Sequence, residues 1–134
     1  MWLPLRAGTS WEYVHTMYRI PAGETFSFLR GRSLDQLCFG RHQLIMRFDE
    51  GLYVSVEGQL GVQPADSEET VVDDTRDAAA TLVTALGTLV RDVVVDDDRS
   101  FSMTFEGGLR VRVIDSSDEY ESFQIGHGRS VFIV

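Results

Sequence analysis

The sequence predicts an α+β domain in which an antiparallel β-sheet carries one main helix. Three observations support this fold class: several short stretches alternate apolar and polar residues, glycine-containing turns separate them, and one stretch has apolar residues at helical spacing. The chain has 134 residues, of which 43% are hydrophobic and 25% are charged. This length and composition predict a single domain over residues 1–134.

An internal repeat organises the predicted sheet. Residues 29–57 resemble residues 85–115, with one residue inserted part-way through the second copy. Most matched positions have similar size and polarity, and both glycines are retained. The matched pairs are Gly31 and Gly87, Leu34 and Val90, Leu37 and Val93, Phe39 and Val95, Leu44 and Phe101, Met46 and Met103, Phe48 and Phe105, Gly51 and Gly108, Leu52 and Leu109, Val54 and Val111, and Val56 and Val113.

Each copy is predicted to form a three-stranded meander, over about residues 34–57 and 90–114. Period-two alternation gives each strand one buried face. The turns at 49–51 and 106–108 end in glycine, which a three-residue hairpin uses at positive φ. We expect the two meanders to form one continuous sheet or a pair of facing sheets. The predicted core is Leu37, Phe39, Leu44, Met46, Phe48, Leu52, Val54 and Val56, with Val93, Val95, Phe101, Met103, Phe105, Leu109, Val111 and Val113.

The segment between the copies divides into a linker and a helix. Residues 58–74 are rich in glycine, proline and acidic residues, which predicts an acidic linker. The main helix is expected at residues 75–86, where Gly87 can end it, and it is expected to pack on the sheet. The candidate N-caps are Asp73, Asp74 and Thr75, and the expected packing face is Ala79, Leu82, Val83 and Leu86.

Two further short strands are expected near the C-terminus, at residues 120–125 and 130–134. The loop between them has the length of a hairpin turn. The chain ends on the apolar run VFIV, which has to be buried at a sheet edge or against another copy. A homodimer through an exposed sheet edge or through this C-terminal strand is therefore a hypothesis.

The stretch VVVDDDRSF, residues 93–101, contains three consecutive aspartates. Asp96, Asp97 and Asp98 fall where residues 40–43 join two strands in the first copy, so a hairpin turn is the favoured interpretation. A metal site is disfavoured, because a calcium loop needs spaced ligands, a glycine and a distal glutamate. We predict no metal, no cofactor and no catalytic residue for this chain.

Charge is distributed unevenly along the sequence. Residues 64–134 hold fifteen acidic residues against six arginines, which accounts for the whole net charge of −9. An acidic surface repels phosphate backbones, so nucleic acid is not an expected partner, whereas a basic protein is. The expected contacts with such a partner are Asp96, Asp97, Asp98, Asp73 and Asp74. The competing interpretation is that the charge only keeps the protein soluble.

The sequence also bears on location. No apolar run approaches the roughly 20 residues that span a bilayer, so no membrane partner is expected. The N-terminus lacks the extended apolar region of a secretory signal, and the single cysteine, Cys38, cannot form an internal disulfide. These features predict a cytoplasmic protein.

A rival hypothesis places an anion-binding site on the second meander. Arg110 and Arg112 share the outer face of their strand and, with His127, could bind a carboxylate or phosphate. The protein would then be a small enzyme or a ligand-binding protein; a housekeeping role is a further alternative. No phosphate-binding loop, dinucleotide-binding motif or nucleophile elbow is present in the sequence, so a non-catalytic protein is the favoured prediction.

The Gly-x-x-Leu/Val opening of each copy, the FDEG and FEGG turns and the YESFQI tail are similar to a group of small uncharacterised bacterial proteins. The resemblance covers about residues 29–125. Some members are suspected of being immunity proteins for secreted toxins, so the resemblance implies an inhibitor that covers a basic toxin or nuclease domain. The shared motifs are structural, and no functional residue follows from them.

Overall fold

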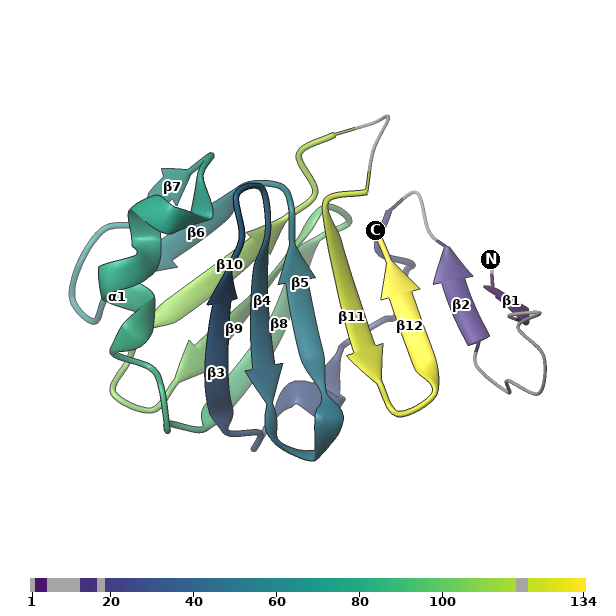
Figure 1. Cartoon of the computed structure of the whole chain (residues 1–134), viewed down its shortest axis with the longest axis horizontal. Coiled ribbons are helices and arrows are strands. Elements are labelled where there is room, and N and C mark those ends of the chain that lie inside the picture. The colour runs from purple at the N-terminus through teal and green to yellow at the C-terminus, as the bar shows by residue number, and fades with distance from the viewer. Residues whose placement is uncertain (1, 5–12, 17–18, 118–120) are drawn as a thin grey trace.

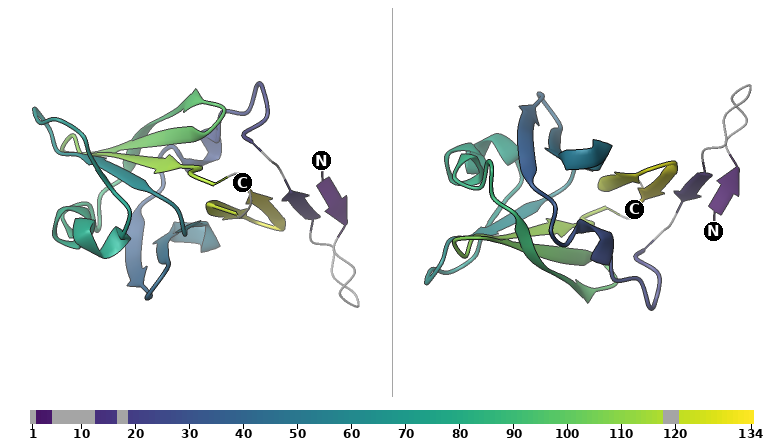
Figure 2. Two further views of the ribbon diagram at one scale, coloured as in Figure 1. Left: turned by 90° about the horizontal axis from the view of Figure 1, so that it is seen from above. Right: turned by 90° about the horizontal axis from the view of Figure 1, so that it is seen from below.

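The computed structural model describes residues 2–4, 13–16, 19–117 and 121–134. Two β-sheets pack face to face, and a short helix lies at one side of the sandwich (Figures 1 and 2). The architecture is broadly the predicted α+β class, with mostly antiparallel strands. The strands are β1 (Trp2–Pro4), β2 (Tyr13–Thr16), β3 (Leu34–Phe39), β4 (Leu44–Phe48), β5 (Tyr53–Val56), β6 (Leu60–Gln63), β7 (Thr70–Val72), β8 (Val90–Asp97), β9 (Ser100–Phe105), β10 (Arg110–Ile114), β11 (Phe123–His127) and β12 (Ser130–Ile133).

The two meanders occupy different sheets. Strands β3, β4 and β5 form one edge of a seven-stranded sheet with the order β1-β2-β12-β11-β5-β4-β3. Strands β8, β9 and β10 form one edge of a five-stranded sheet with the order β7-β6-β10-β9-β8. The strand after each meander crosses to the opposite sheet, because β6 pairs with β10 and β11 pairs with β5. Each sheet is therefore completed by strands that follow the other meander, which the prediction of two tandem meanders did not include.

Reciprocal hydrogen bonds join the beginnings of the two copies. The Gly31 N–H donates to the Val90 carbonyl at 2.7 Å, and the Gly87 N–H donates to the Leu34 carbonyl at 2.8 Å. Both glycines have positive φ, 83° and 81°, a conformation that residues with a Cβ adopt at a cost. The matched positions of the two copies thus contact each other across a local twofold relation.

Residues 58–74, expected to form a linker, instead include β6 and β7. Leu60 and Val62 are buried, and they extend the core beyond the two meanders. The alternation in β6 is short, and the glycines at 58 and 61 and the polar loop that follows make it hard to recognise in the sequence. Only the part between β6 and β7 behaves as the predicted loop.

The helix is shorter than predicted and buries a different face. A 3₁₀ turn, η3 (Thr75–Ala78), leads into α1 (Ala79–Val83), and the other 3₁₀ turns are η1 (Ser27–Leu29) and η2 (Asp49–Gly51). Because a 3₁₀ helix has about three residues per turn and an α-helix about 3.6, η3 changes which residues of the following helix face the core. The buried residues are Ala78, Leu82 and Ala85, whereas Val83 and Leu86 are exposed. Figure 2 shows α1 beside the open side of the sandwich rather than over a sheet face.

The core lies between the two sheets. Of the predicted core residues, all are buried except Leu37, Phe39 and Val95, which are partly buried and pack against the others. These three lie on β3 and β8, the outermost strands of their sheets, where less of the facing sheet covers them. Four phenylalanines contact one another in a row across the core, from Phe132 through Phe26 and Phe101 to Phe123; the Phe26–Phe101 contact is tilted and the other two are edge-on.

The C-terminal strands β11 and β12 form the predicted hairpin. The outer edge of β12 pairs in parallel with β2, and β1 pairs with β2, so both strands continue the seven-stranded sheet beyond the facing sheet (Figure 2). The C-terminal strand, one of the two places where a homodimer contact was a hypothesis, is thus paired with β2 within the chain. In the described part of the chain, no helix is long and apolar enough to cross a membrane.

Candidate functional site

One end of the sandwich gathers acidic side chains. The β3–β4 hairpin, the β5–β6 connection, the β7–η3 turn, the β8–β9 hairpin and the β10–β11 crossing meet there, at the top of Figure 1. Hydrogen bonds join these loops, since the Asp115 N–H donates to the Arg99 carbonyl at 2.6 Å and the Gly58 N–H donates to the Ser122 carbonyl at 2.9 Å. We call this region the acidic end, and its described carboxylates are Glu57, Asp73, Asp74, Asp97, Asp98, Asp115 and Glu121.

Asp115 holds the acidic end together. Its side chain is 1% exposed and accepts hydrogen bonds from Arg19 Nη1 at 3.2 Å and from Ser122 Oγ at 2.9 Å. A buried carboxylate is tolerated when charged or polar partners satisfy it. Asp115 therefore fixes the β10–β11 crossing and is not available to a partner.

The three consecutive aspartates form the end of β8 and the following turn. Asp96 accepts from Ser102 Oγ at 2.6 Å and pairs with Arg110 at 2.7 Å, so its charge is balanced within the protein. Asp97 accepts from the Arg99 N–H and from Ser100 Oγ, as turn aspartates commonly do. Only the Asp98 side chain makes no hydrogen bond or ion pair with the rest of the described chain.

Asp73 and Asp74 lie at the start of η3, across the acidic end from that turn. Asp74 caps η3 by accepting from the Arg76 N–H at 3.0 Å, and it also pairs with the Arg76 guanidinium. These hydrogen bonds with Arg76 lower the pKa of Asp74 to about 2. Asp73 accepts from the Gln59 side-chain amide at 2.8 Å and has no ion pair with an arginine among the described residues.

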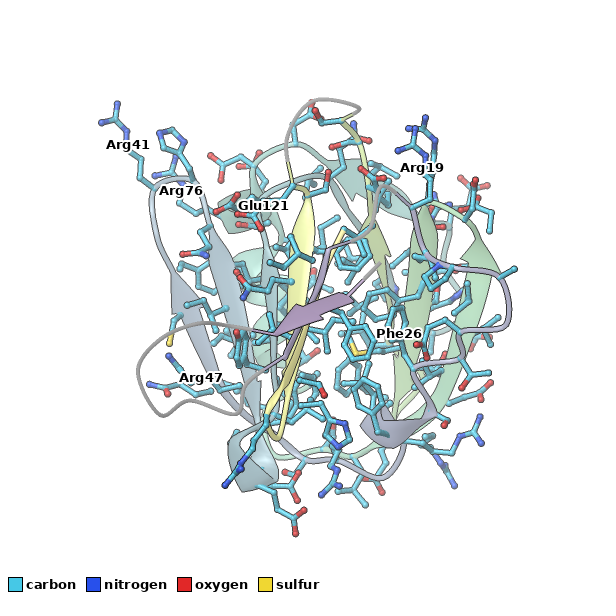
Figure 3. All side chains as sticks on the ribbon, turned by 90° about the vertical axis from the view of Figure 1, so that its right-hand side faces the viewer. Arg19, Phe26, Arg41, Arg47, Arg76 and Glu121 are labelled. Carbon is cyan, nitrogen blue, oxygen red and sulfur yellow. The ribbon has the colours of Figure 1, made fainter. Side chains whose placement is uncertain are left out.

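Glu57 and Glu121 form a second acidic pair, on the outer face of the seven-stranded sheet. Partial burial raises the pKa of Glu121, and repulsion from the Glu57 carboxylate raises it further. Within the described ranges, neither glutamate has an ion pair. Figure 3 shows Glu121 near the same corner as Arg41 and Arg76, and Arg19 at the opposite corner of this end.

A solvent-open hollow of about 410 Å³ lies between the β3–β4 hairpin, the end of β5 and the start of η3. Its lining residues are Arg41, His42, Glu57, Gly58, Asp73, Asp74, Thr75 and Arg76. It brings Asp73 and Asp74 beside residues that the sequence did not mark as a site. Among the residues that the structure describes, no cluster of His, Cys, Asp or Glu could hold a metal ion.

The rival anion-binding residues do not form one site. Arg110 pairs with Asp96, and Arg112 makes two hydrogen bonds with Glu69 at 2.7 and 3.0 Å. His127 lies in the other sheet, where its ring stacks on Phe28 with the centroids 4.1 Å apart. The two arginines are thus neutralised by nearby carboxylates, and the histidine is part of the aromatic packing.

A family model described as a family of unknown function, DUF6188, matches residues 27–134. The chain belongs to this family. The match begins just before the first repeat and includes all of β11 and β12, so it extends beyond residues 29–125, where the sequence resemblance was expected. No curated protein and no solved structure matches the chain.

In this DUF6188 protein, the hollow forms between chain segments whose proximity was not predicted from the sequence. Arg41 and His42 form the two-residue tip of the β3–β4 hairpin, closed by the Gly40 N–H donating to Gln43. The repeat does indicate that tip, because it corresponds to the turn at Asp98 and Arg99. The approach of η3 to that tip follows from β6 and β7, which were not predicted.

Proposed function

We propose that this protein is a non-catalytic, cytoplasmic protein-binding module that covers a basic partner with its acidic end. An immunity-type inhibitor of a basic toxin domain is the specific form of this proposal. The observation that carries it is the Glu57–Glu121 pair, in which Glu121 is partly desolvated and neither carboxylate has an arginine partner among the described residues.

Electrostatics provide the physical reason. Two like charges held close together raise the free energy of the unbound protein, and a cationic group placed between them removes that repulsion. A surface of one sign also accelerates the encounter with an oppositely charged partner. The acidic end would therefore contribute both to the association rate and to the choice of partner.

The geometry changes which carboxylates we assign to the contact. Asp96 and Asp97 stabilise their own hairpin, and Asp74 stabilises η3. Asp98, Asp73, Glu57 and Glu121 have no arginine partner among the described residues, so they are the groups that a lysine or arginine of the partner would meet. Asp96, Asp97 and Asp74 contribute to the field but not through direct ion pairs.

The proposal is tested by co-expressing the tagged protein with the product of the adjacent gene. We expect the two proteins to co-purify at about 0.1 M salt and to separate as the ionic strength rises, because screening shortens the range of exposed charges. Protection of cells from a toxic neighbour would support the immunity form. Failure to bind the neighbour's product would remove the immunity proposal.

A further inference from the structure

We propose that a second hollow, on the outer face of the seven-stranded sheet, binds a small aromatic carboxylate. This hollow has a volume of about 220 Å³, and its lining residues are Gln43, Ile45, Arg47, Tyr53, Ser55 and Gln124. We call it the Tyr53 hollow. The inference goes beyond the proposed protein partner, because it concerns a low-molecular-weight ligand and rests on residues that are not among the carboxylates of the acidic end.

The strand register determines the layout of the Tyr53 hollow. In β4, Ile45 and Arg47 alternate with three buried apolar residues, so both lie on the outer face of the sheet. On the neighbouring strand β5, Tyr53 pairs with Arg47 and Ser55 pairs with Ile45. Directly paired side chains begin about 5 Å apart. These four residues are therefore immediate neighbours on one face.

The hollow stays open because Tyr53 leans away from β4. Gly126 pairs with Tyr53 on β11, and a Cβ at position 126 would lie 2.0 Å from Tyr53 Cε1. The Tyr53 ring therefore lies directly over the Gly126 backbone, where a larger residue would displace it. Gln124 Nε2 donates a hydrogen bond to Tyr53 Oη at 3.1 Å and holds the ring in this position. Because Ser55 is small, the space beside the ring is left unfilled.

Arg47 is the one charged residue in the described lining of the Tyr53 hollow. Its side chain is exposed and makes no hydrogen bond or ion pair with any residue that the structure describes. Figure 3 shows Arg47 on the side of the seven-stranded sheet that faces away from the five-stranded sheet. Its paired neighbours, Gln36 and Tyr53, are not acidic. The guanidinium can therefore bind a carboxylate through two parallel N–H···O hydrogen bonds.

The outer face of the five-stranded sheet has the opposite arrangement. There Arg110 pairs with Asp96, and Arg112 pairs with Glu69, each at 2.7 Å. Both of these arginines thus have a carboxylate of the chain itself as partner. Arg47 has none among the described residues, so its charge favours an anionic ligand on the face of the first meander.

The rest of the lining favours an aromatic body for this anion. A carboxylate bound to Arg47 has its attached group next to Ile45 and the Tyr53 ring, which are both partly buried. A cavity of roughly 150 Å³ can hold a benzene ring, so the volume of the Tyr53 hollow is sufficient for a ring with a carboxylate. Contact between two aromatic rings is favourable beyond the apolar area that it buries.

The nearby acidic end orients such a ligand. Glu57 follows Tyr53 by four residues, so it lies about 13 Å along the strand from the paired Arg47 and Tyr53. A carboxylate is attracted by Arg47 and repelled by Glu57, which directs the ring toward Ser55. One arginine balances one negative charge, so a monocarboxylate is favoured over a dicarboxylate.

The test is an NMR titration of the full-length ¹⁵N-labelled protein with benzoate. We expect saturable shift changes at the backbone amides of Ile45, Arg47, Tyr53 and Ser55. Acetate carries the charge without the ring, and benzyl alcohol carries the ring without the charge. Each of these two probes should bind at least about threefold more weakly than benzoate. No saturable change with benzoate, or an equal affinity for either probe, would overturn the proposal.

Variants of Arg47 test the charge. Arg47→Ala should weaken benzoate binding by about fivefold to tenfold, whereas Arg47→Lys keeps the charge without the planar fork and should retain part of the affinity. Arg91→Ala is the control, because Arg91 is an exposed arginine on β8 in the other sheet. Unchanged affinity in Arg47→Ala would contradict the site.

Gly126→Ala tests the shape while Arg47 is kept. The added methyl group displaces the Tyr53 ring from its place over β11, so benzoate should bind at least about threefold more weakly. Thermal denaturation shows whether this variant is folded. Ile45→Ser removes the apolar contact at a partly exposed position and should weaken binding to a similar extent. If a folded Gly126→Ala variant and Ile45→Ser both bound benzoate as the wild-type protein does, the aromatic part of the proposal would be wrong.

Discussion

At the scale of single residues, Glu50 has a conformation that its side chain disfavours. Its φ is 58°, in the left-handed region, whereas the corresponding residue of the second copy is Gly107 with φ 91°. The Glu50 side chain also pairs with Arg32 at the surface. The two turns therefore perform the same reversal with residues of different conformational cost.

Replacing Glu50 with glycine should stabilise the protein. Relief of the left-handed strain is worth about 1 kcal/mol, and loss of an exposed ion pair offsets part of it, leaving a net gain of about 0.5 kcal/mol. Urea denaturation measures this gain, and Gly107→Ala, expected to lose about 1 kcal/mol, is the matched control. A destabilised Glu50→Gly variant would mean that the ion pair with Arg32 outweighs the strain.

Glu121 predicts a dependence of stability on pH. Because its pKa is raised in the folded state, ionising Glu121 costs more in the folded protein than in the unfolded chain. The penalty is absent well below the ordinary glutamate pKa and grows as the pH rises through it. Glu121→Gln should therefore increase the free energy of unfolding near pH 7 and leave it unchanged near about pH 3.

The same residue has a direct spectroscopic test. Glu57→Gln removes the repulsive neighbour, so the pKa of Glu121 should fall toward its ordinary value, as followed by ¹³C NMR of the side-chain carboxylate. If the Glu121 pKa did not move, burial alone would set it. The argument for an uncompensated acidic pair would then fail.

At the scale of elements, an acidic residue in the second turn of each meander accepts a hydrogen bond from the residue just before the first strand of the same meander. Glu106 Oε1 accepts from the Leu89 N–H at 2.8 Å, and Asp49 Oδ1 accepts from the Ser33 N–H at 3.2 Å. In return, the Glu106 and Asp49 N–H groups donate to the Leu89 and Ser33 carbonyls. The acidic residue that follows the phenylalanine in FDEG and in FEGG thus has a structural role in both copies.

Removing these carboxylates should cost stability in proportion to the hydrogen bonds. Glu106→Ala should lose about 1 kcal/mol, and Asp49→Ala should lose less because its contact is longer. Glu106→Gln keeps an acceptor oxygen and serves as the control. Chemical denaturation that showed no difference between Glu106→Ala and Glu106→Gln would exclude the proposed role of this hydrogen bond.

Much of the strand and turn structure was predictable from the sequence, because it depends on local patterns. The alternation in residues 44–56 and 101–113 predicted the hairpins and their buried faces, and the turn glycines predicted the positive φ values. The exchange of β6 and β11 between the sheets was not predictable, since pairing partners depend on contacts far apart in the chain. The buried face of the helix was missed because the 3₁₀ turn changes its phase.

At the scale of the whole molecule, the N-terminal strands protect the edge of β12. Strand β2 pairs in parallel with β12, and an uncovered edge strand invites pairing with another chain. Deleting residues 1–18 should therefore promote self-association, which sedimentation velocity would detect as a concentration-dependent dimer. Adding Val131→Lys to the truncated chain should suppress it. A truncated chain as monomeric as the full chain would remove the homodimer hypothesis for this edge.

The candidate site also belongs to this scale, because its loops come from both copies. The sequence identified Asp73, Asp74 and Asp96–Asp98 as acidic, but the fold decides which carboxylates are free. Arg110 neutralises Asp96, and Arg76 neutralises Asp74, whereas Glu57 and Glu121 meet only through the pairing of β5 with β11. Charge alone therefore located the acidic region, but it could not show which of its carboxylates lack an arginine partner.

The most direct measurement is the association rate with the co-purifying basic partner at low ionic strength, for two variants of equal net charge. One carries Glu57→Gln, Asp98→Asn and Glu121→Gln at the acidic end. The control carries Asp35→Asn, Asp66→Asn and Glu68→Gln, three exposed residues outside that end.

The account predicts that the acidic-end variant associates at least about tenfold more slowly than the wild-type protein and that the control changes little. The difference should shrink as added salt screens the charges. Equal slowing in both variants would show that only net charge matters, and it would contradict binding through the acidic end.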